Sequence, residues 1–292
     1  MNTVLAHRSG PMGIDPRMPP VAMRRDGTPS SELPLTTRIQ QPLPTLAILL
    51  ALAMIPARVA WADDATETQA VRWGWGVSAI AIQKPYRRFS PQRWVIPLLI
   101  YNSKWVSVYG PAASFMLPPT GPIAFAFTAR LSRDGYRASD SPVLAGMAPR
   151  RDKFWMGGSA TWRSPWMNVI AEWTGDVSGY SKAMTVSLTM ERTFNYGRFQ
   201  MTPRLAAISL DGKYTNYYFG VRPDEARPDR PAYRPGATVN VEAGMRAAWH
   251  VAPRDSVFVD AAVEHLGSEI TRSPLVDTST QSRLVVGYVH VF

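Results

Sequence analysis

Residues 283–292 (RLVVGYVHVF) decide how the rest of the chain can be interpreted. Every second position back from the terminus carries an apolar or ring-bearing side chain: Phe292, His290, Tyr288, Val286 and Leu284. A period of two is typical of a β-strand that has one apolar face. We therefore predict a strand that runs to the last residue, and its backbone N–H and C=O groups need a neighbouring strand.

This ending is similar to the C-terminal signal of bacterial outer-membrane β-barrels. In such barrels the last strand pairs with the first, and the barrel-assembly machinery reads the terminal aromatic residue. We accordingly assign Tyr288 and Phe292 as an assembly signal, although His290 departs from the usual pattern. The alternative is the last strand of a soluble β-sandwich, and the preceding residues have to decide between the two.

The clearest alternation lies in residues 238–251. Its odd positions are Val, Ala, Met or Trp, whereas its even positions include Asn240, Glu242 and Arg246. The same period recurs at residues 123–131, 167–174 and 184–191. The apolar face of such strands packs on a second sheet in a sandwich and faces lipid in a membrane barrel.

Strand length favours the membrane barrel. The candidate strands are about 9–14 residues long, which suits tilted strands that cross a bilayer. They are residues 72–82, 92–102, 104–116, 122–132, 154–163, 166–175, 182–192, 198–213, 237–251, 255–266 and 282–292. Bacterial barrels of one chain have an even number of strands, so one strand is missed or two candidates belong to one. Prolines at 97, 111, 118 and 119 make residues 92–118 the weakest part, and we expect ten to twelve strands.

The connections alternate between short and long, as a membrane barrel requires. Residues 164–165, 195–197 and 252–254 look like periplasmic turns, and residues 133–153, 214–236 and 267–281 look like external loops. Trp and Tyr residues lie near many predicted strand ends, where they can form aromatic girdles. The sequence therefore predicts an all-β fold, a single antiparallel transmembrane β-barrel over residues 71–292.

The residues before the barrel resemble an export signal. Residues 1–37 are rich in Pro, Gly, Ser and Arg and are expected to be disordered, with translation starting there or at a downstream Met. Residues 38–62 contain a basic residue, an apolar run and the small-x-small sequence AWA, which is the order of a signal peptide. Residues 63–70 form a short segment before the barrel. An exported barrel belongs in the outer membrane of a Gram-negative cell.

Composition excludes several classes of function. The chain has no Cys, which removes disulfide scaffolds and thiol nucleophiles. Its formal charge is +10, but the basic residues are scattered and do not indicate nucleic-acid binding. No metal or nucleotide motif occurs, so we expect no cofactor. His265 near Asp260 or Glu264 is the nearest approach to a catalytic pair, and an interfacial His is the simpler interpretation.

The chain resembles the MipA/OmpV family of outer-membrane proteins, also called MltA-interacting proteins, over most of residues 71–292 and most clearly over residues 214–276. The matching positions are Tyr218, Phe219, Gly220 and Val221, then Tyr233, Pro235 and Gly236, and finally Ser273 and Pro274. The chain departs from the family by its long leader and by an insertion at residues 222–230. The resemblance implies a barrel without enzymatic activity, either a scaffold that links a lytic transglycosylase and a peptidoglycan synthase or an adhesion protein.

The inward-facing charges suggest a second function, a small channel. Glu242 and Arg246 are expected to face Asp260 and Glu264 across one hairpin and to form a charge network in the lumen. Other charges that we expect to face inward are Arg130, Glu172, Glu191, Arg204 and Arg283. Charges of both signs on neighbouring strands favour a filled lumen over an open one.

The insertion carries a cluster of arginines. Arg222, Arg227, Arg230 and Arg234 lie in one external loop and are candidates for contacts with lipopolysaccharide phosphates. The alternative is a solvated loop that is balanced by its own Asp and Glu residues. Outer-membrane lipid, lipopolysaccharide, the barrel-assembly machinery and the two murein enzymes are the expected partners.

Overall fold

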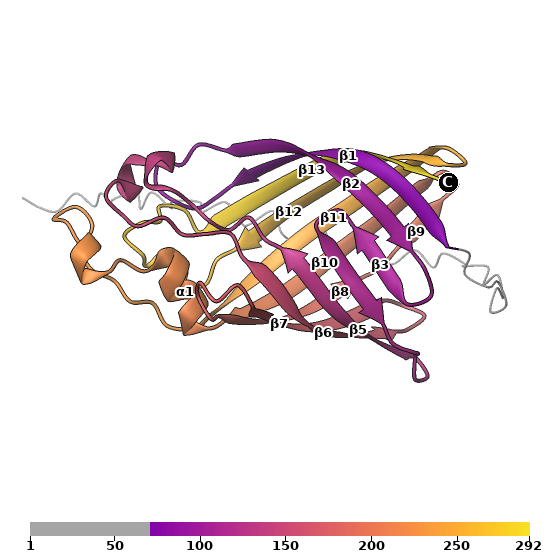
Figure 1. Ribbon diagram of the computed structural model, residues 1–292, viewed down its shortest axis with the longest axis horizontal. Coiled ribbons are helices and arrows are strands. Elements are labelled where there is room, and N and C mark those ends of the chain that lie inside the picture. The colour runs from indigo at the N-terminus through magenta and orange to yellow at the C-terminus, as the bar shows by residue number, and fades with distance from the viewer. Residues whose placement is uncertain (1–70) are drawn as a thin grey trace, which may run out of the picture. The chain divides into compact units, whose positions relative to one another are not determined.

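The computed structural model describes residues 71–292, which form one β-barrel (Figure 1). The leader, the signal peptide and residues 63–70 lie outside the described residues. The strands are β1 (Arg72–Gln83), β2 (Gln92–Asn102), β3 (Val106–Tyr109), β4 (Ala112–Met116), β5 (Ile123–Leu131), β6 (Phe154–Arg163), β7 (Asn168–Asp176), β8 (Met184–Glu191), β9 (Phe194–Tyr196), β10 (Phe199–Leu210), β11 (Thr238–Ala252), β12 (Asp255–His265) and β13 (Thr280–Val291).

Antiparallel pairing closes these strands into a barrel. Apart from β8 and β9, each strand pairs with its neighbours in sequence, and β13 pairs with β1. The short β9 continues β8, because both pair with β10, so the barrel has twelve strands. The backbone N–H of Phe292 donates to the carbonyl of Trp73 at 2.8 Å and completes the junction between the last and first strands.

The twelfth strand explains the odd number of candidates in the sequence. Residues 104–116, which the pattern predicted as one strand, form the hairpin β3–β4. Gly110 takes a φ of +54° at its tip, a conformation that suits Gly, and Pro111 follows it. The membrane barrel and its even strand number are confirmed, and the single strand over residues 104–116 was wrong.

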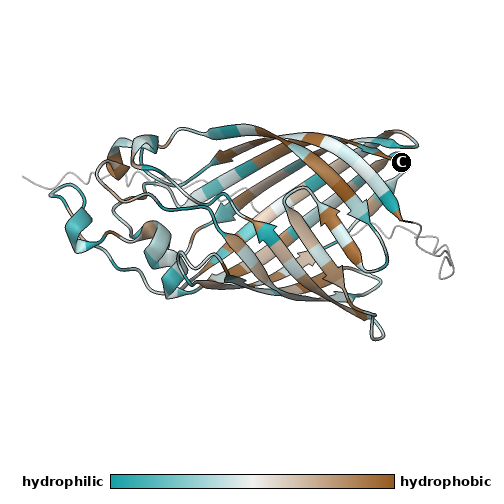
Figure 2. Cartoon of the chain, in the orientation of Figure 1, coloured by the Kyte–Doolittle hydropathy of each residue, from teal (hydrophilic) through white to brown (hydrophobic). Residues whose placement is uncertain are grey.

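Hydrophobic and hydrophilic residues follow one another along many of the strands (Figure 2), and on β11 the two faces differ in polarity as the alternation predicted. On β11 the odd residues point outward, and Val239, Val241 and Trp249 are exposed. The even residues point into the lumen, where Asn240 is buried. Because large apolar side chains cover the outside of the barrel, this surface suits the hydrocarbon of a bilayer.

The two ends of the barrel are built differently (Figure 1). One end has tight turns, such as the two residues Pro253 and Arg254 between β11 and β12. The other end carries long loops that contain the helices α1 (Gly212–Phe219), α2 (Ser268–Thr271), η3 (Ala138–Asp140), η4 (Pro142–Leu144) and η5 (Pro223–Glu225). Short turns face the periplasm in outer-membrane barrels, so the long loops are extracellular. No helix among residues 71–292 is both long and apolar enough to cross a membrane.

Gly157 shows how closely neighbouring strands pack on the inner side of β6. A Cβ at Gly157 would lie 1.8 Å from the carbonyl oxygen of Trp173 on β7. At the adjacent Gly158, the nearest atom to such a Cβ is 3.7 Å away. The neighbouring strand therefore excludes a side chain at Gly157 but not at Gly158.

We predict that Gly157→Ala destabilises the barrel by about 1–3 kcal/mol, because the strands must move apart to admit the methyl group. Gly158→Ala is the matched control and should leave stability unchanged. The measurement is the temperature at which the folded, fast-migrating form is lost in electrophoresis of unheated samples. Equal midpoints for the two variants would contradict this account of the β6–β7 contact.

Candidate functional site

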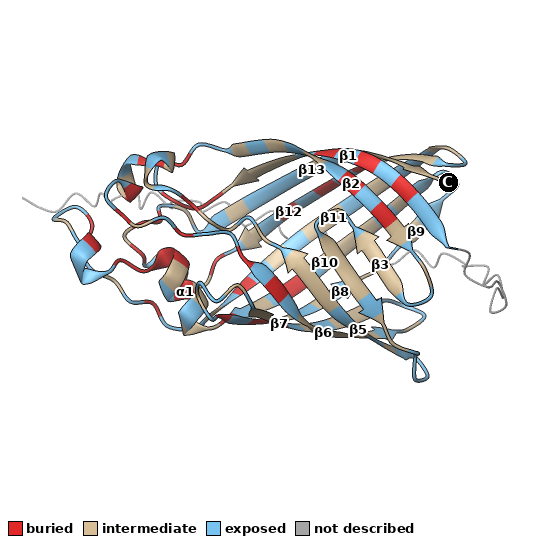
Figure 3. Cartoon of the chain, in the orientation of Figure 1, coloured by how far each residue is buried: buried red, intermediate tan, exposed pale blue. Residues whose placement is uncertain are grey.

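The extracellular loops form a packed cap with its own hydrophobic core. Buried residues concentrate at this end of the molecule (Figure 3). Four loops contribute to the core, which consists of Tyr86, Phe89, Tyr136, Leu144, Met147, Leu210, Tyr218, Phe219, Val221, Leu266, Ile270, Leu275 and Val276. Tyr86 stacks on Phe219, with ring centroids 5.5 Å apart, and donates a hydrogen bond to the carbonyl of Tyr218 at 3.2 Å. The loops therefore cover the barrel mouth as one unit.

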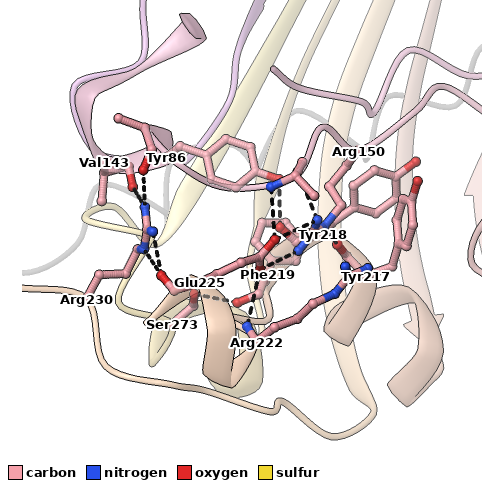
Figure 4. Close-up of polar contacts among 12 residues, drawn as sticks. Tyr86, Val143, Arg150, Tyr217, Tyr218, Phe219, Arg222, Glu225, Arg230 and Ser273 are labelled. Atoms are coloured by element: carbon pink, nitrogen blue, oxygen red, sulfur yellow. Dashed lines mark hydrogen bonds and ion pairs between the residues drawn. The ribbon is translucent and has the colours of Figure 1, made fainter. Parts of the chain in front are cut away.

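A buried ion pair joins two of these loops (Figure 4). The side chains of Arg150 and Glu225 are only 2% and 4% exposed. Arg150 Nη1 and Nη2 donate to Glu225 Oε1 and Oε2 at 3.1 and 2.9 Å, and Arg150 Nε donates to the carbonyl of Tyr217 at 2.6 Å. Removing one partner of such a pair leaves a buried charge without compensation, so each partner depends on the other.

Further hydrogen bonds stabilise the carboxylate of Glu225. The backbone N–H groups of Ala148 and Arg222 donate to it at 3.0 and 3.2 Å. Burial by itself would raise the pKa of Glu225, but the hydrogen bonds from Arg150 and the two amides outweigh burial and lower the pKa below its usual value. Glu225 is therefore ionised throughout the physiological range.

The arginines of the insertion have different environments. Arg230 is buried, and its guanidinium group donates to the carbonyls of Val143, Ala145 and Glu225. The expectation that Arg230 contacts lipopolysaccharide was wrong, because the cap uses this side chain internally. Arg227 is partly exposed and lies 3.7 Å from Asp229, while Arg222 and Arg234 are exposed.

The residues between 214 and 276 that carry the clearest family resemblance all lie in the cap. Tyr218, Phe219 and Val221 are buried in its core, and Val221 pairs with Tyr233 through two backbone hydrogen bonds. Gly220 follows α1 where a Cβ would lie 2.4 Å from the carbonyl oxygen of Asn216. Pro235, Gly236, Ser273 and Pro274 occupy the connections that follow, and Ser273 Oγ donates to the carbonyl of Phe219 at 2.7 Å. Their common role is to pack the loops together.

Lys153, which the sequence did not single out, lies in a cage of aromatic rings. Its ammonium nitrogen is 4.2–5.1 Å from the ring centroids of Trp155, Tyr214, Tyr217 and Tyr218. The side chain is buried, and within residues 71–292 its Nζ has no hydrogen-bond partner. Burial lowers the pKa of Lys153 to about 8, while the ring faces attract the charged form.

Below the cap, the lumen contains two cavities of about 720 and 610 Å³. The upper cavity lies against the cap, where Tyr86, Tyr218 and Phe219 line it. The lower cavity is lined by polar residues such as Gln200 and Thr202 near the periplasmic turns. The lumen is thus divided into an upper and a lower chamber.

A charged network lies between the chambers, and Arg204 is at its centre. Arg204 Nη1 and Nη2 donate to both carboxylate oxygens of Asp260 at 3.0 and 2.9 Å, and Arg204 Nε donates to Glu242 at 3.0 Å. Arg246 reaches Asp260 at 3.1 Å, and Arg283 lies 3.6 Å from Glu242. Each pair joins adjacent strands or strands separated by one other strand, which is why the polar faces of β10 to β13 can neutralise one another.

Aromatic side chains extend this network across the lumen. Tyr109, on β3, lies with its ring 5.9 Å from the guanidinium carbon of Arg246 and 6.4 Å from the ring of Phe258 on β12. Strands β13, β1 and β2 separate β12 from β3 in the barrel, so this contact spans the interior. The network and Tyr109 together narrow the lumen at mid-height.

The four charges expected to form the lumen network are only partly joined. Arg246 contacts Asp260 directly, and Arg204 connects Glu242 to them. Glu264 lies opposite Glu242 and instead accepts hydrogen bonds from Asn240 and Gln281, both at 2.6 Å. On the other side of the barrel, Arg130 pairs with Glu172. His265 points outward, away from Glu264, so the two do not form a catalytic pair.

The two residues assigned to the assembly signal lie at the periplasmic end. Tyr288 Oη donates to Asp255 Oδ1 at 2.5 Å, and His290 Nδ1 lies 2.8 Å from the same oxygen. Phe292 is exposed, and its ring lies 5.1 Å from that of His290. Among residues 71–292, no group of three or more His, Cys, Asp or Glu side chains is placed to hold a metal ion.

Known proteins match most of the barrel. Residues 75–292 match the model of the family described as MltA-interacting protein MipA. The chain belongs to this family. One relative, the putative outer membrane protein YiaT of Escherichia coli K12, is 24% identical over 215 residues, 73% of this chain and 87% of YiaT. The MltA-interacting protein of E. coli K12 is 22% identical over 247 residues, 84% of this chain and 98% of that protein.

A third relative is the outer membrane protein OmpV of Vibrio cholerae, which is 27% identical over 106 residues, 36% of this chain and 41% of OmpV. Among solved structures, an outer-membrane channel from Pseudomonas putida F1 has a TM-score of 0.40 and 11% identity, covering 76% of this chain and 95% of that one. The family, the relatives and the barrel fold place this MipA-family protein in the outer membrane. The resemblance seen in the sequence is confirmed.

We predict that Glu225→Gln loosens the cap by about 3–5 kcal/mol, because Arg150 stays buried without its counter-charge. Trypsin added to intact cells should then cleave the cap after the exposed Arg151 and Lys213, neither of which is followed by Pro, much faster than in the wild type. Asp229→Asn is the matched control, because its exposed pair with Arg227 contributes at most about 1 kcal/mol. Equal cleavage of both variants would contradict a structural role for the buried pair.

Acid should weaken the cap in the same way. The pKa of Glu225 is lower in the folded cap than in the unfolded chain. Ionised Glu225 therefore stabilises the cap fully above the unfolded pKa of about 4.3, and this stabilisation is lost as the pH falls through the pKa of the folded state. Cleavage of the wild type by an acid-active protease should therefore rise below about pH 4. The Glu225→Gln variant lacks this titration and serves as the control.

Proposed function

We propose that this protein is a non-enzymatic platform in the outer membrane, whose periplasmic face binds murein-remodelling enzymes. The observation that carries the proposal is the obstructed lumen. A packed cap covers the extracellular mouth, and the Arg204 network with Tyr109 narrows the interior. A barrel with an obstructed lumen can still bind other proteins through its outer surfaces. The surface that faces the murein layer is the ring of periplasmic turns.

The charge of this ring supports a binding role. Most periplasmic turns carry an exposed or partly exposed basic residue, namely Lys104, Arg163, Arg192, Arg198 and Arg254, and Arg72 begins β1 at the same end. The nearest acids are Asp255, which Tyr288 and His290 bind, and Glu191 inside the lumen. A surface of one sign attracts a partner of the opposite sign and increases its rate of association.

The family supports the identity of the partner. The relative in E. coli is named for an interaction with MltA, and this chain matches it along 84% of its own length. A lytic transglycosylase and a peptidoglycan synthase are therefore the partners that we propose for the periplasmic rim. On the other side of the membrane, Arg222 and Arg234 are exposed and remain candidates for lipopolysaccharide phosphates.

The test is copurification of murein enzymes with the solubilised, full-length protein after cross-linking in the envelope. We expect the wild type to recover a lytic transglycosylase, and the triple variant Lys104→Gln, Arg163→Gln, Arg254→Gln to recover about tenfold less, since rim charges speed association. The matched control changes the extracellular Lys182, Arg222 and Arg234 to Gln and should behave as the wild type. Recovery of no murein enzyme, or equal recovery by both variants, would contradict the proposal.

A small channel is the second candidate, and the two chambers favour it. They share the lining residues Ile80, Ile96 and Arg283, so movement of Tyr109 would connect them. Recording across planar bilayers separates the two functions. The platform predicts no stable conductance from the wild type, and a steady ion-selective current would establish the channel instead.

A further inference from the structure

The barrel wall is incomplete on one side, above the short hairpin β3–β4. All of β2, from Gln92 to Asn102, pairs with β1. On its other side β2 pairs with β3 only at Ile100 to Asn102, and the N–H of Gly110 donates to the carbonyl of Leu99 at 2.9 Å. The upper half of β2, residues 92–98, therefore has a free edge within the described barrel.

The sequence of β2 is adapted to this free edge. The carbonyl of Leu99 points toward β3, so the backbone groups of Pro97, Val95 and Arg93 point the same way. Pro97 has no N–H and removes one donor that would lack a partner in lipid. A Pro at this position is unsuitable for a fully paired strand but suits the border of an opening.

The upper chamber reaches through the wall at this edge. Outward-facing residues do not normally line the interior of a barrel, yet Pro97 on β2 and Leu131 on β5 both line the upper cavity. The tip of the hairpin, Gly110 and Pro111, lines it between them. The cavity thus opens sideways toward the bilayer, between β2 and β5 and above β3–β4.

The upper chamber has an apolar side and a polar side. Its apolar lumen side chains are Ile80, Ile82, Trp94, Ile96, Ile208, Leu210 and Val285, with Leu266 and Ile270 from the cap side. Polar side chains line the rest of the wall, including Arg130, Asn240, Glu242, Glu264, Gln281 and Arg283. The volume of about 720 Å³ lies within the range of pockets that hold small organic ligands. A chamber with an apolar side next to an opening toward lipid suits an amphiphile that partitions into the membrane.

Polar groups gather at the border of the opening. Arg133 lies with its guanidinium carbon 5.2 Å from the ring of Trp94, and it forms no ion pair within the described barrel. The adjacent Ser132 Oγ is buried without a hydrogen-bond partner among residues 71–292. Lys84 is close enough to Asp134 for their charges to interact, so Arg133 is the basic group at this border without an acidic partner in the described barrel.

We propose that the upper chamber binds one single-chain anionic amphiphile, of the fatty-acid type, which enters sideways from the outer leaflet. Its chain lies among the isoleucines of β1 and β2, and its carboxylate binds Arg133 and Ser132 at the border. The head group also supplies polar atoms to the free edge of β2, which lipid tails cannot do. This binding site is independent of the platform function, because it lies at the opposite end of the barrel from the periplasmic rim.

The first test measures binding of radiolabelled palmitate to the full-length protein in lipid nanodiscs. We expect saturable binding by the wild type and a loss of at least about tenfold in affinity in Ile80→Trp, because the added ring fills the chamber. Ala79→Trp is the matched control, since Ala79 faces outward on the same strand. Absence of saturable binding, or equal binding by the two variants, would overturn the proposal.

The second test concerns the head group and does not depend on Ile80→Trp folding. Arg133→Gln should weaken palmitate binding about tenfold, the typical effect of a lost charge-assisted contact, and leave hexadecanol binding unchanged. Arg137→Gln, an exposed change in the same loop, is the control. Equal losses for palmitate and hexadecanol would contradict recognition of an anionic head.

The third test concerns the sideways route. The chain has no Cys, so a single introduced Cys can be modified alone. A bulky thiol reagent on Pro97→Cys should slow palmitate uptake, whereas the same reagent on Val95→Cys, which does not line the chamber, should not. Unchanged uptake after modification at position 97 would exclude entry between β2 and β5. Recovery of murein enzymes should be the same in all these variants, which keeps this proposal separate from the platform.

Discussion

The structure depends on one constraint, the need of every backbone polar group in a bilayer for a partner. Twelve strands meet it by pairing β13 with β1 and β10 with β11, which leaves no ordinary edge. The final N–H, that of Phe292, is paired with Trp73. The free upper edge of β2 is the exception within the described barrel. There Pro97 removes one backbone donor, and polar groups at the border of the upper chamber lie where a neighbouring strand would otherwise be.

The cap is stabilised differently, by a buried hydrophobic core like that of a water-soluble domain. Its loops bury a core of aromatic and aliphatic residues and hold a buried ion pair that is fully hydrogen-bonded. The residues that identify the family, including Phe219, Val221 and Ser273, lie in this core. The most recognisable part of the sequence therefore encodes the closure of the barrel.

The sequence predicted the features that depend on the local alternation of residues along a strand. It failed for contacts between residues that are far apart in the sequence. Residues 238–251 showed both faces of β11, and the pairing of Arg246 with Asp260 followed from the hairpin that joins β11 to β12. Residues 104–116 concealed a hairpin because a short strand on each side of Gly110 mimics one long strand. Arg150 and Glu225 are 75 residues apart, and no pattern in two irregular loops reveals such a pair. Arg230 was misassigned for the same reason.

The central claim is that the cap closes the barrel from outside, and a Cys in the upper chamber tests it most directly. Thr185 lines this chamber and is buried, and its hydroxyl lies 2.9 Å from that of Thr174, so Thr185→Cys changes little. Intact cells would be treated with a charged, membrane-impermeant maleimide, with the exposed Asp224→Cys as the positive control. The account predicts labelling at position 224 and none at position 185. Rapid labelling at position 185 would contradict it.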